Sequence, residues 1–568
     1  MPRNSINRLL DQLDESKRRF GPGESKRTEE LLARLTRTKF SDAESLIRLH
    51  EALLFLRAYP QSARVRTLAE SLLNSFDKRI LALREQEVDL SPLDHPEVSG
   101  IAGRTVTDTF SYPIVRWLVR CQQGRVSLDW DWFEDENRLA ETWPRFMPLL
   151  EEDAFVEANV PYPTWLSESK RDSANGLAWL IERFESLPRT YQEQAELYDS
   201  QKLYVRWRPP YRATRTGMRL PVQKIFYHRD ALIRRKDVSL ERELETPSPS
   251  LKQLTAKQGE AILDMAREAS TARYRELYGF THGDPGRVFK TNPGRGVDIF
   301  LMGLPPNRRL PLRAYHAAMI FKNGVPVGYF EGLSLFERME GGFNLYYSFR
   351  EGETAWLYAR TLNIFHHLLG VTAFSIDPYQ IGYENEEGIE SGAFWFYRKL
   401  GFRPTNSAGK KLVLSEENKI NSRSAYRTSS KTLRKLADGS MIFEMDNSKS
   451  GDWDRFQVRN IGLAIQRRMA AKFRGDAERI RIASVEKLTR VLGTHIKDWR
   501  EAELPALSDF AVTLSLVEDL ARWTESEKQG LLRIIRAKAG NDENSYLKLM
   551  QKHTRLRNEM IKLGSDNH

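Results

Sequence analysis

The residues whose types and spacing could do chemistry gather between positions 343 and 404. Arg350, Gly352 and Thr354 form a short polar turn between an aromatic run that ends at Phe349 and a helix-like stretch. A strand that turns through glycine into a helix presents backbone N–H groups at the positive end of the helix dipole, where a phosphate or pyrophosphate binds well. The turn therefore predicts an anion-binding site, although a plain strand-to-helix connection has the same pattern.

Three further side chains could supply acid–base chemistry. Tyr397 lies in an aromatic stretch, and its phenol could protonate a leaving group; packing against its aromatic neighbours is the alternative. Glu331 lies where one predicted strand ends, and Glu340 precedes another. Each carboxylate is a candidate general base, and each could instead be a solvated surface group.

Several other enzyme classes leave no trace in the sequence. The metalloprotease, phosphate-loop, nucleophile-elbow and dinucleotide-binding patterns are all missing. His366 and His367 are adjacent in a predicted helix, so they cannot both face one site. Cys121 is the single cysteine, which excludes an internal disulfide and a cysteine metal cluster. We therefore predict no metal.

The elements that must position these residues alternate between strands and helices. Asn323-Gly324 is a strong hairpin signal, because the tight turn needs positive φ at both residues. Apolar periodicity and glycine stops predict helices at 256–278, 354–369 and 393–400. Apolar, β-branched and aromatic runs predict strands at 297–301, 317–321, 325–330, 344–349 and 371–376, with weaker strand signals at 412–414 and 441–443.

This order resembles the GNAT superfamily of acyl-CoA-dependent N-acyltransferases over roughly residues 255–415. The resemblance is carried by Ala393-Phe-Trp-Phe-Tyr-Arg-Lys-Leu-Gly-Phe402 and by the hairpin Lys322–Glu331. It implies acetyl-CoA or another acyl-CoA as substrate, an amine as acceptor and Tyr397 as the acid for the departing thiolate. It also places the cofactor pyrophosphate on Phe349, Arg350, Gly352, Glu353, Thr354 and Ala355.

The turn departs from the family signature of Gln or Arg, two residues, Gly, one residue, then Gly or Ala. Phe349 takes the first position and Thr354 the last. Glu351 and Glu353 also bring negative charge beside the expected pyrophosphate, which is unfavourable. These departures keep open a second interpretation, a catalytically inactive domain of this shape inside a scaffold or partner-binding protein.

At 568 residues the chain is long enough for three or four domains. We predict an α+β multidomain protein with a central GNAT-like mixed α/β sheet domain between mainly helical N- and C-terminal regions. Ser41–Glu44 and Thr524–Glu527 fit helix capping boxes in these flanks. The expected regions are a helical 1–95, a Trp-rich and mostly helical 96–245, the acyltransferase-like 251–415, a polar connection 416–454 and a basic helical bundle 455–568.

Charge suggests further partners. The net charge is +11, and residues 405–568 hold 31 Lys and Arg against 22 Asp and Glu. The stretch 204–236 mixes arginines with aromatic residues, a composition that could bind single-stranded nucleic acid; we favour an ordinary solvated basic face, because no recognised nucleic-acid module surrounds it. An acidic partner or polyanion could bind the basic C-terminal region. The acidic loop 377–392 would favour a cationic amine as acceptor.

The remaining expectation concerns the compartment. The first twenty residues are charged throughout and carry no apolar signal core. The longest apolar runs are far shorter than a membrane span. We therefore expect a cytoplasmic protein without a membrane partner.

Overall fold

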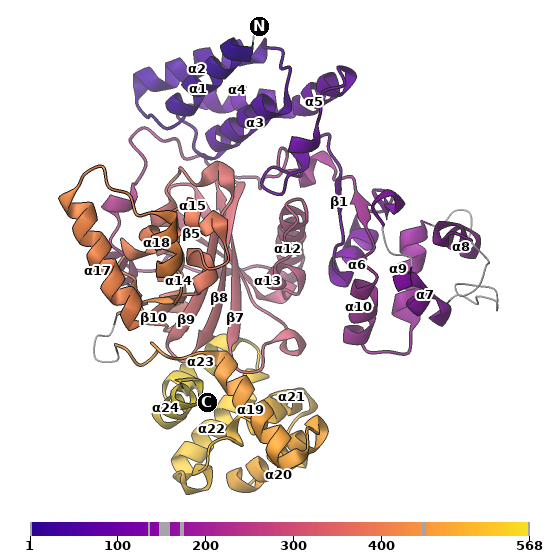
Figure 1. Cartoon of the computed structure of the whole chain (residues 1–568), viewed down its shortest axis with the longest axis vertical. Coiled ribbons are helices and arrows are strands. Elements are labelled where there is room, and N and C mark those ends of the chain that lie inside the picture. The colour runs from indigo at the N-terminus through magenta and orange to yellow at the C-terminus, as the bar shows by residue number, and fades with distance from the viewer. Residues whose placement is uncertain (1–2, 134–136, 147–159, 171–174, 446–449, 566–568) are drawn as a thin grey trace.

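The computed structural model describes residues 3–133, 137–146, 160–170, 175–445 and 450–565. Within these residues the protein is α+β, as predicted: a nine-stranded mixed sheet occupies the centre, and helices from both ends of the chain pack at its two ends (Figure 1). The described helices include none with both the length and the apolar character needed to cross a bilayer.

The N-terminal helices share one apolar core with the central sheet. Helix α3 begins where the Asp42 carboxylate accepts a hydrogen bond from the Ser45 backbone, so Asp42 caps the helix in place of the predicted Ser41. The five helices are α1 (Arg3–Ser16), α2 (Pro22–Thr36), α3 (Ala43–Ala58), α4 (Ala63–Asn74) and α5 (Phe76–Glu85).

The Trp-rich region forms a separate aromatic core beside the sheet (Figure 1). It contains helices, as predicted, together with a small antiparallel sheet that the sequence did not indicate, ordered β1-β3-β2 in the described part. Its elements are β1 (Val106–Asp108), α6 (Tyr112–Cys121), β2 (Val126–Leu128), α7 (Asn137–Thr142), α8 (Tyr162–Ser169), α9 (Gly176–Ser186), α10 (Tyr191–Ser200) and β3 (Val205–Trp207). The next helix, α11 (Leu240–Glu245), packs with the main core instead.

The large sheet has the order β11-β12-β10-β9-β8-β7-β6-β5-β4 over the described residues. Its strands are β4 (Lys252–Gln253), β5 (Val288–Gly294), β6 (Val297–Met302), β7 (Ala314–Lys322), β8 (Val325–Leu335), β9 (Arg338–Leu345), β10 (Ala373–Ile376), β11 (Arg403–Pro404) and β12 (Met441–Glu444). Strands β9 and β10 run parallel, while the other ladders between described strands are antiparallel.

Helices cover both faces of this sheet. The Tyr358 ring of α14 lies 5.1 Å from Phe343 of β9, which seats α14 on one face. Helices α12 and α13 cover the other face, where Leu263 and Phe280 pack with apolar residues of β6 and β7. The helices of this region are α12 (Ala256–Thr271), α13 (Tyr278–Thr281), α14 (Thr354–Leu369), α15 (Glu386–Glu390), α16 (Ala393–Arg398), α17 (Ser407–Ser422) and α18 (Ser430–Leu436).

Two strand predictions need correction. The strand expected at 344–349 is displaced: β9 ends at Leu345, and Phe349 lies in the 3-10 turn η8 (Tyr347–Phe349). The signal at 412–414 is wrong, because these residues belong to helix α17, which also spans the boundary expected at 415. The signal at 441–443 is confirmed as β12, which inserts between β10 and β11.

The C-terminal helices are joined to the sheet through buried polar contacts. Arg557 Nε and Trp453 Nε1 donate to Glu337 Oε1 at 2.7 and 2.9 Å. Helix α22 begins with the capping box predicted at Thr524. These helices are α19 (Val458–Phe473), α20 (Ala477–Leu492), α21 (Leu504–Leu514), α22 (Glu525–Lys538), α23 (Glu543–Gln551) and α24 (Thr554–Ser565).

Candidate active site

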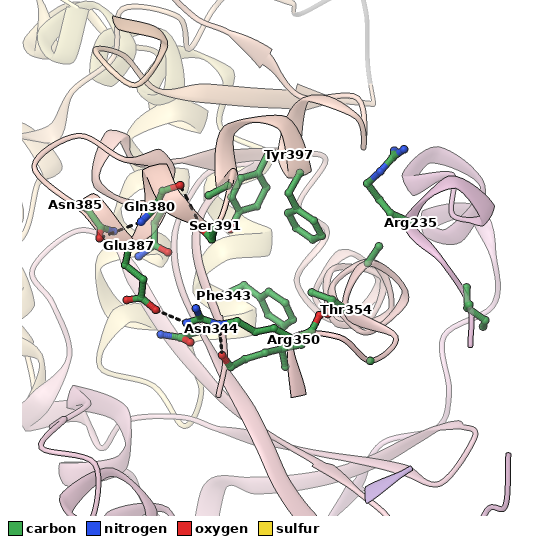
Figure 2. A pocket seen from close by; sticks show the side chains of 17 residues that line it. Arg235, Phe343, Asn344, Arg350, Thr354, Gln380, Asn385, Glu387, Ser391 and Tyr397 are labelled. Atoms are coloured by element: carbon green, nitrogen blue, oxygen red, sulfur yellow. Dashed lines mark hydrogen bonds and ion pairs between the residues drawn. The ribbon is translucent and has the colours of Figure 1, made fainter. Parts of the chain in front are cut away.

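A pocket of about 400 Å³ lies at the start of helix α14 (Figure 2). We call it the donor pocket. Four elements meet there: the end of β9, the first turn of α14, the segment around α15 and the helix α16. Its walls are formed by Ile233, Arg235, Phe343, Asn344, Leu345, Arg350, Gly352, Thr354, Ala355, Gln380, Asn385, Glu387, Gly388, Ser391, Ala393, Phe396 and Tyr397.

The pocket exists because two parallel strands part. The ladder between β9 and β10 pairs Arg338–Glu340 with Ala373–Ser375 and ends there, although β9 continues to Leu345. The last three residues of β9 therefore border the pocket instead of a neighbouring strand. Crevices beyond the carboxyl ends of parallel strands are the usual ligand sites of open α/β sheets.

The first turn of α14 presents backbone donors to this pocket. Its N-cap residue, Glu353, makes no side-chain capping bond, and the Thr354 hydroxyl donates backwards to the Arg350 carbonyl at 2.9 Å. The first intrahelical bond of the ladder runs from Leu357 N to Glu353 O, at 2.9 Å. The preceding N–H groups have no acceptor within the helix, so the positive dipole end of a 16-residue helix faces the pocket.

The two acidic residues of the turn point away from the pocket and are paired. Glu351 accepts from Lys17 at 3.2 Å and from Arg18 at 2.9 Å, both near the end of α1. Glu353 is fully buried against Lys322 and Arg295. Burial alone would raise the pKa of Glu353, but these cations outweigh burial and hold that pKa below its ordinary value. The cations paired with Glu351 and Glu353 therefore offset the repulsion that these carboxylates would exert on a bound anion.

Gly352 is required for a reason that the sequence did not indicate. An added Cβ would lie 2.5 Å from the Tyr59 hydroxyl and 2.6 Å from its ring carbon. Tyr59 is the residue that follows helix α3, so the N-terminal helices press directly on this turn. Gly352 thus both lines the pocket and admits Tyr59.

Two arginines border the pocket. Arg350 donates through Nε to the Leu345 carbonyl at 3.2 Å, and its guanidinium pairs with Glu387 of α15. Arg235 opens the short 3-10 helix η5 (Arg235–Asp237) and donates to the Lys399 carbonyl at 3.2 Å. Figure 2 shows them on separate elements around the pocket. Arg235 adds positive charge to the backbone N–H donors of the helix terminus, whereas the charge of Arg350 is shared with Glu387, which also lines the pocket.

Tyr397 lies on the side of the pocket opposite Arg350 (Figure 2). Its ring is buried and packs edge-on against Tyr358 and Phe402, with 5.6 Å between ring centroids in each pair. Burial raises the pKa of the Tyr397 phenol, so the group keeps its proton at neutral pH. Tyr397 therefore both packs against its aromatic neighbours and lines the pocket.

The two candidate bases do not line the donor pocket. Glu331 accepts from the Tyr315 hydroxyl, and burial raises its pKa. Glu340 accepts from Arg338 at 3.0 Å and from Arg313 at 3.3 Å, which keeps its carboxylate engaged. Two of the expected cofactor residues, Phe349 and Glu353, are buried and line no part of the pocket.

The structure thus brings together Arg350, Gly352, Thr354, Ala355 and Tyr397. The other walls come partly from segments that the sequence had singled out, the closing motif 393–402 and the acidic loop 377–392, although their individual residues were not assigned to the cofactor site. Arg235 had one signal, since it lies near the end of the basic stretch 204–236. The rest of that stretch is largely used internally: Arg215 pairs with buried Glu51, Arg219 with Glu70 and Arg206 with Asp129.

Two of the five carboxylates in the acidic loop are neutralised by arginines. Glu386 accepts from Arg434 at 2.8 Å, and Glu387 pairs with Arg350. Asp377 accepts from the Tyr379 backbone at 2.9 Å and keeps one carboxylate oxygen for other partners. Less negative charge therefore faces an acceptor than the sequence suggested.

No family model, curated protein or solved structure matches this chain. Within the described residues, no group of three or more His, Cys, Asp and Glu side chains is placed to hold a metal ion. The chemistry of the site therefore has to be argued from its own groups.

Proposed function

We propose that the central domain is a GNAT-like N-acyltransferase that moves an acyl group from acyl-CoA to an amine. The observation that carries the proposal is the uncapped start of α14, which faces a pocket with Arg350 on one side and Tyr397 on the other. A scaffold has no need for donors, cations and a protonated phenol around one cavity.

The order of elements supports the same proposal. Helix α12 is followed by the antiparallel strands β5 to β9, and then by α14, β10 and α16. This is the succession that the resemblance implies. The closing motif forms α16, and its Tyr397 lines the same pocket as the start of α14.

The acyl donor would lie across the first turn of α14. Its pyrophosphate would accept from the backbone N–H groups of Thr354 and Ala355, which need no particular side chain. Arg350 and Arg235 would hold the remaining phosphate charge. A cavity of about 400 Å³ admits the pantetheine arm, because pockets for small ligands have volumes of this order.

The transfer itself is an addition followed by elimination. The neutral amine gives its lone pair to the thioester carbonyl carbon and forms the C–N bond. The C–S bond then breaks, and the thiolate takes the proton of the Tyr397 phenol. The proton lost by the attacking nitrogen passes to water, which restores the phenol. General acid help of this kind contributes about 10²–10⁴-fold.

Calorimetric titration with acetyl-CoA and with CoA tests the donor site. Thr354→Asp places a carboxylate at the first turn of α14, where it suits the helix dipole but repels a pyrophosphate. We expect micromolar binding by the unaltered protein and at least about tenfold weaker binding by Thr354→Asp.

Thr554→Asp is the matched control, because it adds the same charge at the exposed start of α24, away from the pocket. Its affinity for acetyl-CoA should be unchanged. Absent binding by the unaltered protein would favour the alternative, a partner-binding module that keeps the fold without the chemistry. Equal binding by Thr354→Asp would place the ligand elsewhere.

A further inference from the structure

A second cavity, of about 540 Å³, lies on the other side of the segment that follows β10. We call it the bipolar pocket. Six of its lining residues carry the argument: Arg338, Asp377, Tyr383, Asp438, Arg455 and Arg459. It is formed jointly by the sheet, the approach to β12 and the beginning of α19.

The two pockets share a wall. Asp377 and Tyr383 line the bipolar pocket, while Gln380 and Asn385, from the same segment, line the donor pocket. Ser375 pairs with Glu340 in the parallel ladder, so Asp377 lies level with Gly342, just where β9 and β10 have parted. A group held at Asp377 therefore lies against the segment that separates the two pockets.

Several charges of the bipolar pocket are already compensated inside the protein. Arg338 donates to Glu340 and to the Ser375 hydroxyl, each at 3.0 Å. Asp454 accepts from Arg403 at 2.7 Å and from Lys410 at 2.8 Å. These groups fix the shape of the cavity and leave little charge for a ligand.

Four other charges form no ion pair with any described residue: the carboxylates Asp377 and Asp438, and the guanidinium groups Arg455 and Arg459. They come from different parts of the chain. Asp377 belongs to the wall shared with the donor pocket, whereas Arg455 and Arg459 belong to the C-terminal region. The pocket therefore combines carboxylates and guanidinium groups from different parts of the chain, with Asp377 at the wall that it shares with the donor pocket.

We propose that the bipolar pocket binds the acyl acceptor, and that the acceptor is an amino acid. This inference rests on the proposed acyltransferase function and specifies its second substrate. Arg455 and Arg459 hold the carboxylate, for which guanidinium geometry is well suited. Asp377 attracts the ammonium group to the shared wall. Arg455 and Arg459 are both exposed, so an amine without a carboxylate forgoes these two contacts, and an acid without an amine has nothing to acylate.

This orientation completes a balanced reaction. The ammonium group loses one proton to water, and its nitrogen then attacks the carbon of a thioester presented at the shared wall. The products are an N-acyl amino acid and CoA with its thiol protonated. No oxidant or metal is needed, because the thioester supplies the leaving group.

The test measures release of CoA thiol from acetyl-CoA with each of the twenty common L-amino acids. The best substrate is then compared with its decarboxylated amine. We expect the amino acid to be the better acceptor. The double variant Arg455→Met/Arg459→Met should raise KM for the amino acid by about ten- to a hundredfold, because its carboxylate loses both exposed guanidinium partners. KM for the decarboxylated amine should not change.

Arg479→Met is the matched control, since Arg479 is an exposed arginine on α20 that does not line the pocket. Calorimetry with acetyl-CoA separates the two proposals. If acetyl-CoA binds and decarboxylated amines react as well as amino acids, the acceptor inference is wrong and the acyltransferase stands. If the double variant leaves KM for the amino acid unchanged, the bipolar pocket is not the acceptor site. Absent binding of acetyl-CoA would overturn both.

Discussion

Tyr397 has two roles to separate: its ring packs in the core, and its phenol is the proposed proton donor of the donor pocket. Its ring fills the space between Tyr358 and Phe402, and its edge borders the donor pocket. A substitution that keeps the ring separates these roles. The buried phenol has a raised pKa, so it can act as a proton donor throughout the neutral range.

We predict that Tyr397→Phe lowers kcat by about a hundredfold while the Kd for acetyl-CoA stays unchanged. The ring remains, so the pocket keeps its shape and only the proton is lost. Steady-state kinetics and calorimetry on the same preparation provide the two values. An unaltered kcat would show that water protonates the thiolate, and a lost affinity would show that Tyr397 binds the donor.

Glu268 provides a prediction about pH at the contact between α12 and α6. It accepts from Gln122 Nε2 at 3.0 Å, and burial raises its pKa from 4.5 to about 7. The folded protein therefore binds this proton more tightly than the unfolded chain does. By linkage, the contribution of Glu268 to the free energy of unfolding falls as pH rises from about 4.5 to about 7.

Glu268→Gln keeps a neutral group at this site at every pH. We expect the variant to match the parent protein near pH 4.5 and to be more stable at pH 8, by roughly 3 kcal/mol. Denaturation curves at the two pH values, compared between the two proteins, measure the difference. A difference that does not change with pH would contradict the assignment.

At the residue scale the sequence identified the groups whose chemistry is local. Arg350, Gly352, Thr354 and Tyr397 were found because backbone donors and a phenol act through their type and their place in a short motif. Arg235 could not be assigned to the site, because 115 positions separate it from Arg350 and only tertiary packing unites them. The same holds for Tyr59, which is distant in the sequence but leaves no space for a side chain at position 352.

At the scale of elements, α14 depends on a buried ion pair beneath its first turn. Lys322 has no exposed side-chain surface, and burial lowers its pKa to about 8. Glu353 lies 3.2 Å from its ammonium nitrogen. The strand β7, which ends at Lys322, is thereby tied to the residue where α14 begins.

Removing one partner should cost more than removing both. Glu353→Gln leaves Lys322 buried without its carboxylate, and we expect a loss of about 3–5 kcal/mol in the free energy of unfolding. Lys322→Met combined with Glu353→Gln should recover part of this loss. Denaturation of the two single variants and the double variant measures the coupling, and strict additivity would contradict it.

Most elements of the sheet could be predicted, since apolar runs and glycine stops are local signals. The hairpin at Asn323-Gly324 and the helix after the turn are examples. The signal at 412–414 failed because a short apolar run fits a helix and a strand equally, and packing placed it in α17. The separation of β9 from β10, which creates the pocket, has no sequence signal, because it depends on where the hydrogen-bonded ladder between them ends.

At the scale of the whole molecule, helices from both termini brace the sheet. The C-terminal helices are connected to it through Glu337, whose carboxylate accepts from Arg557 and Trp453. Burial alone would raise the pKa of Glu337, but these donors outweigh burial and lower it. The stabilisation is therefore present at neutral pH and is lost as pH falls through the lowered pKa.

We predict that Arg557→Met destabilises the protein by about 3–5 kcal/mol at pH 7, because Glu337 keeps its charge without its guanidinium partner. The difference from the parent protein should shrink on acidification, because without Arg557 burial makes Glu337 take up its proton at a higher pH in the variant than in the parent. Melting temperatures of the variant and the parent protein, measured between pH 4 and pH 8, test this trend. A constant difference would mean that Arg557 acts through packing alone.

The contact of Tyr59 with Gly352 has a consequence for how the protein is made. These residues are 293 positions apart, so the N-terminal helices leave the ribosome long before the turn on which they press. At about 5–20 residues per second the interval is roughly 15–60 s. During that time the surface around Tyr59, Lys17 and Arg18 stays uncovered on the nascent chain. The donor pocket is complete only once Tyr397 has been synthesised, so a fragment released before that residue lacks part of its wall.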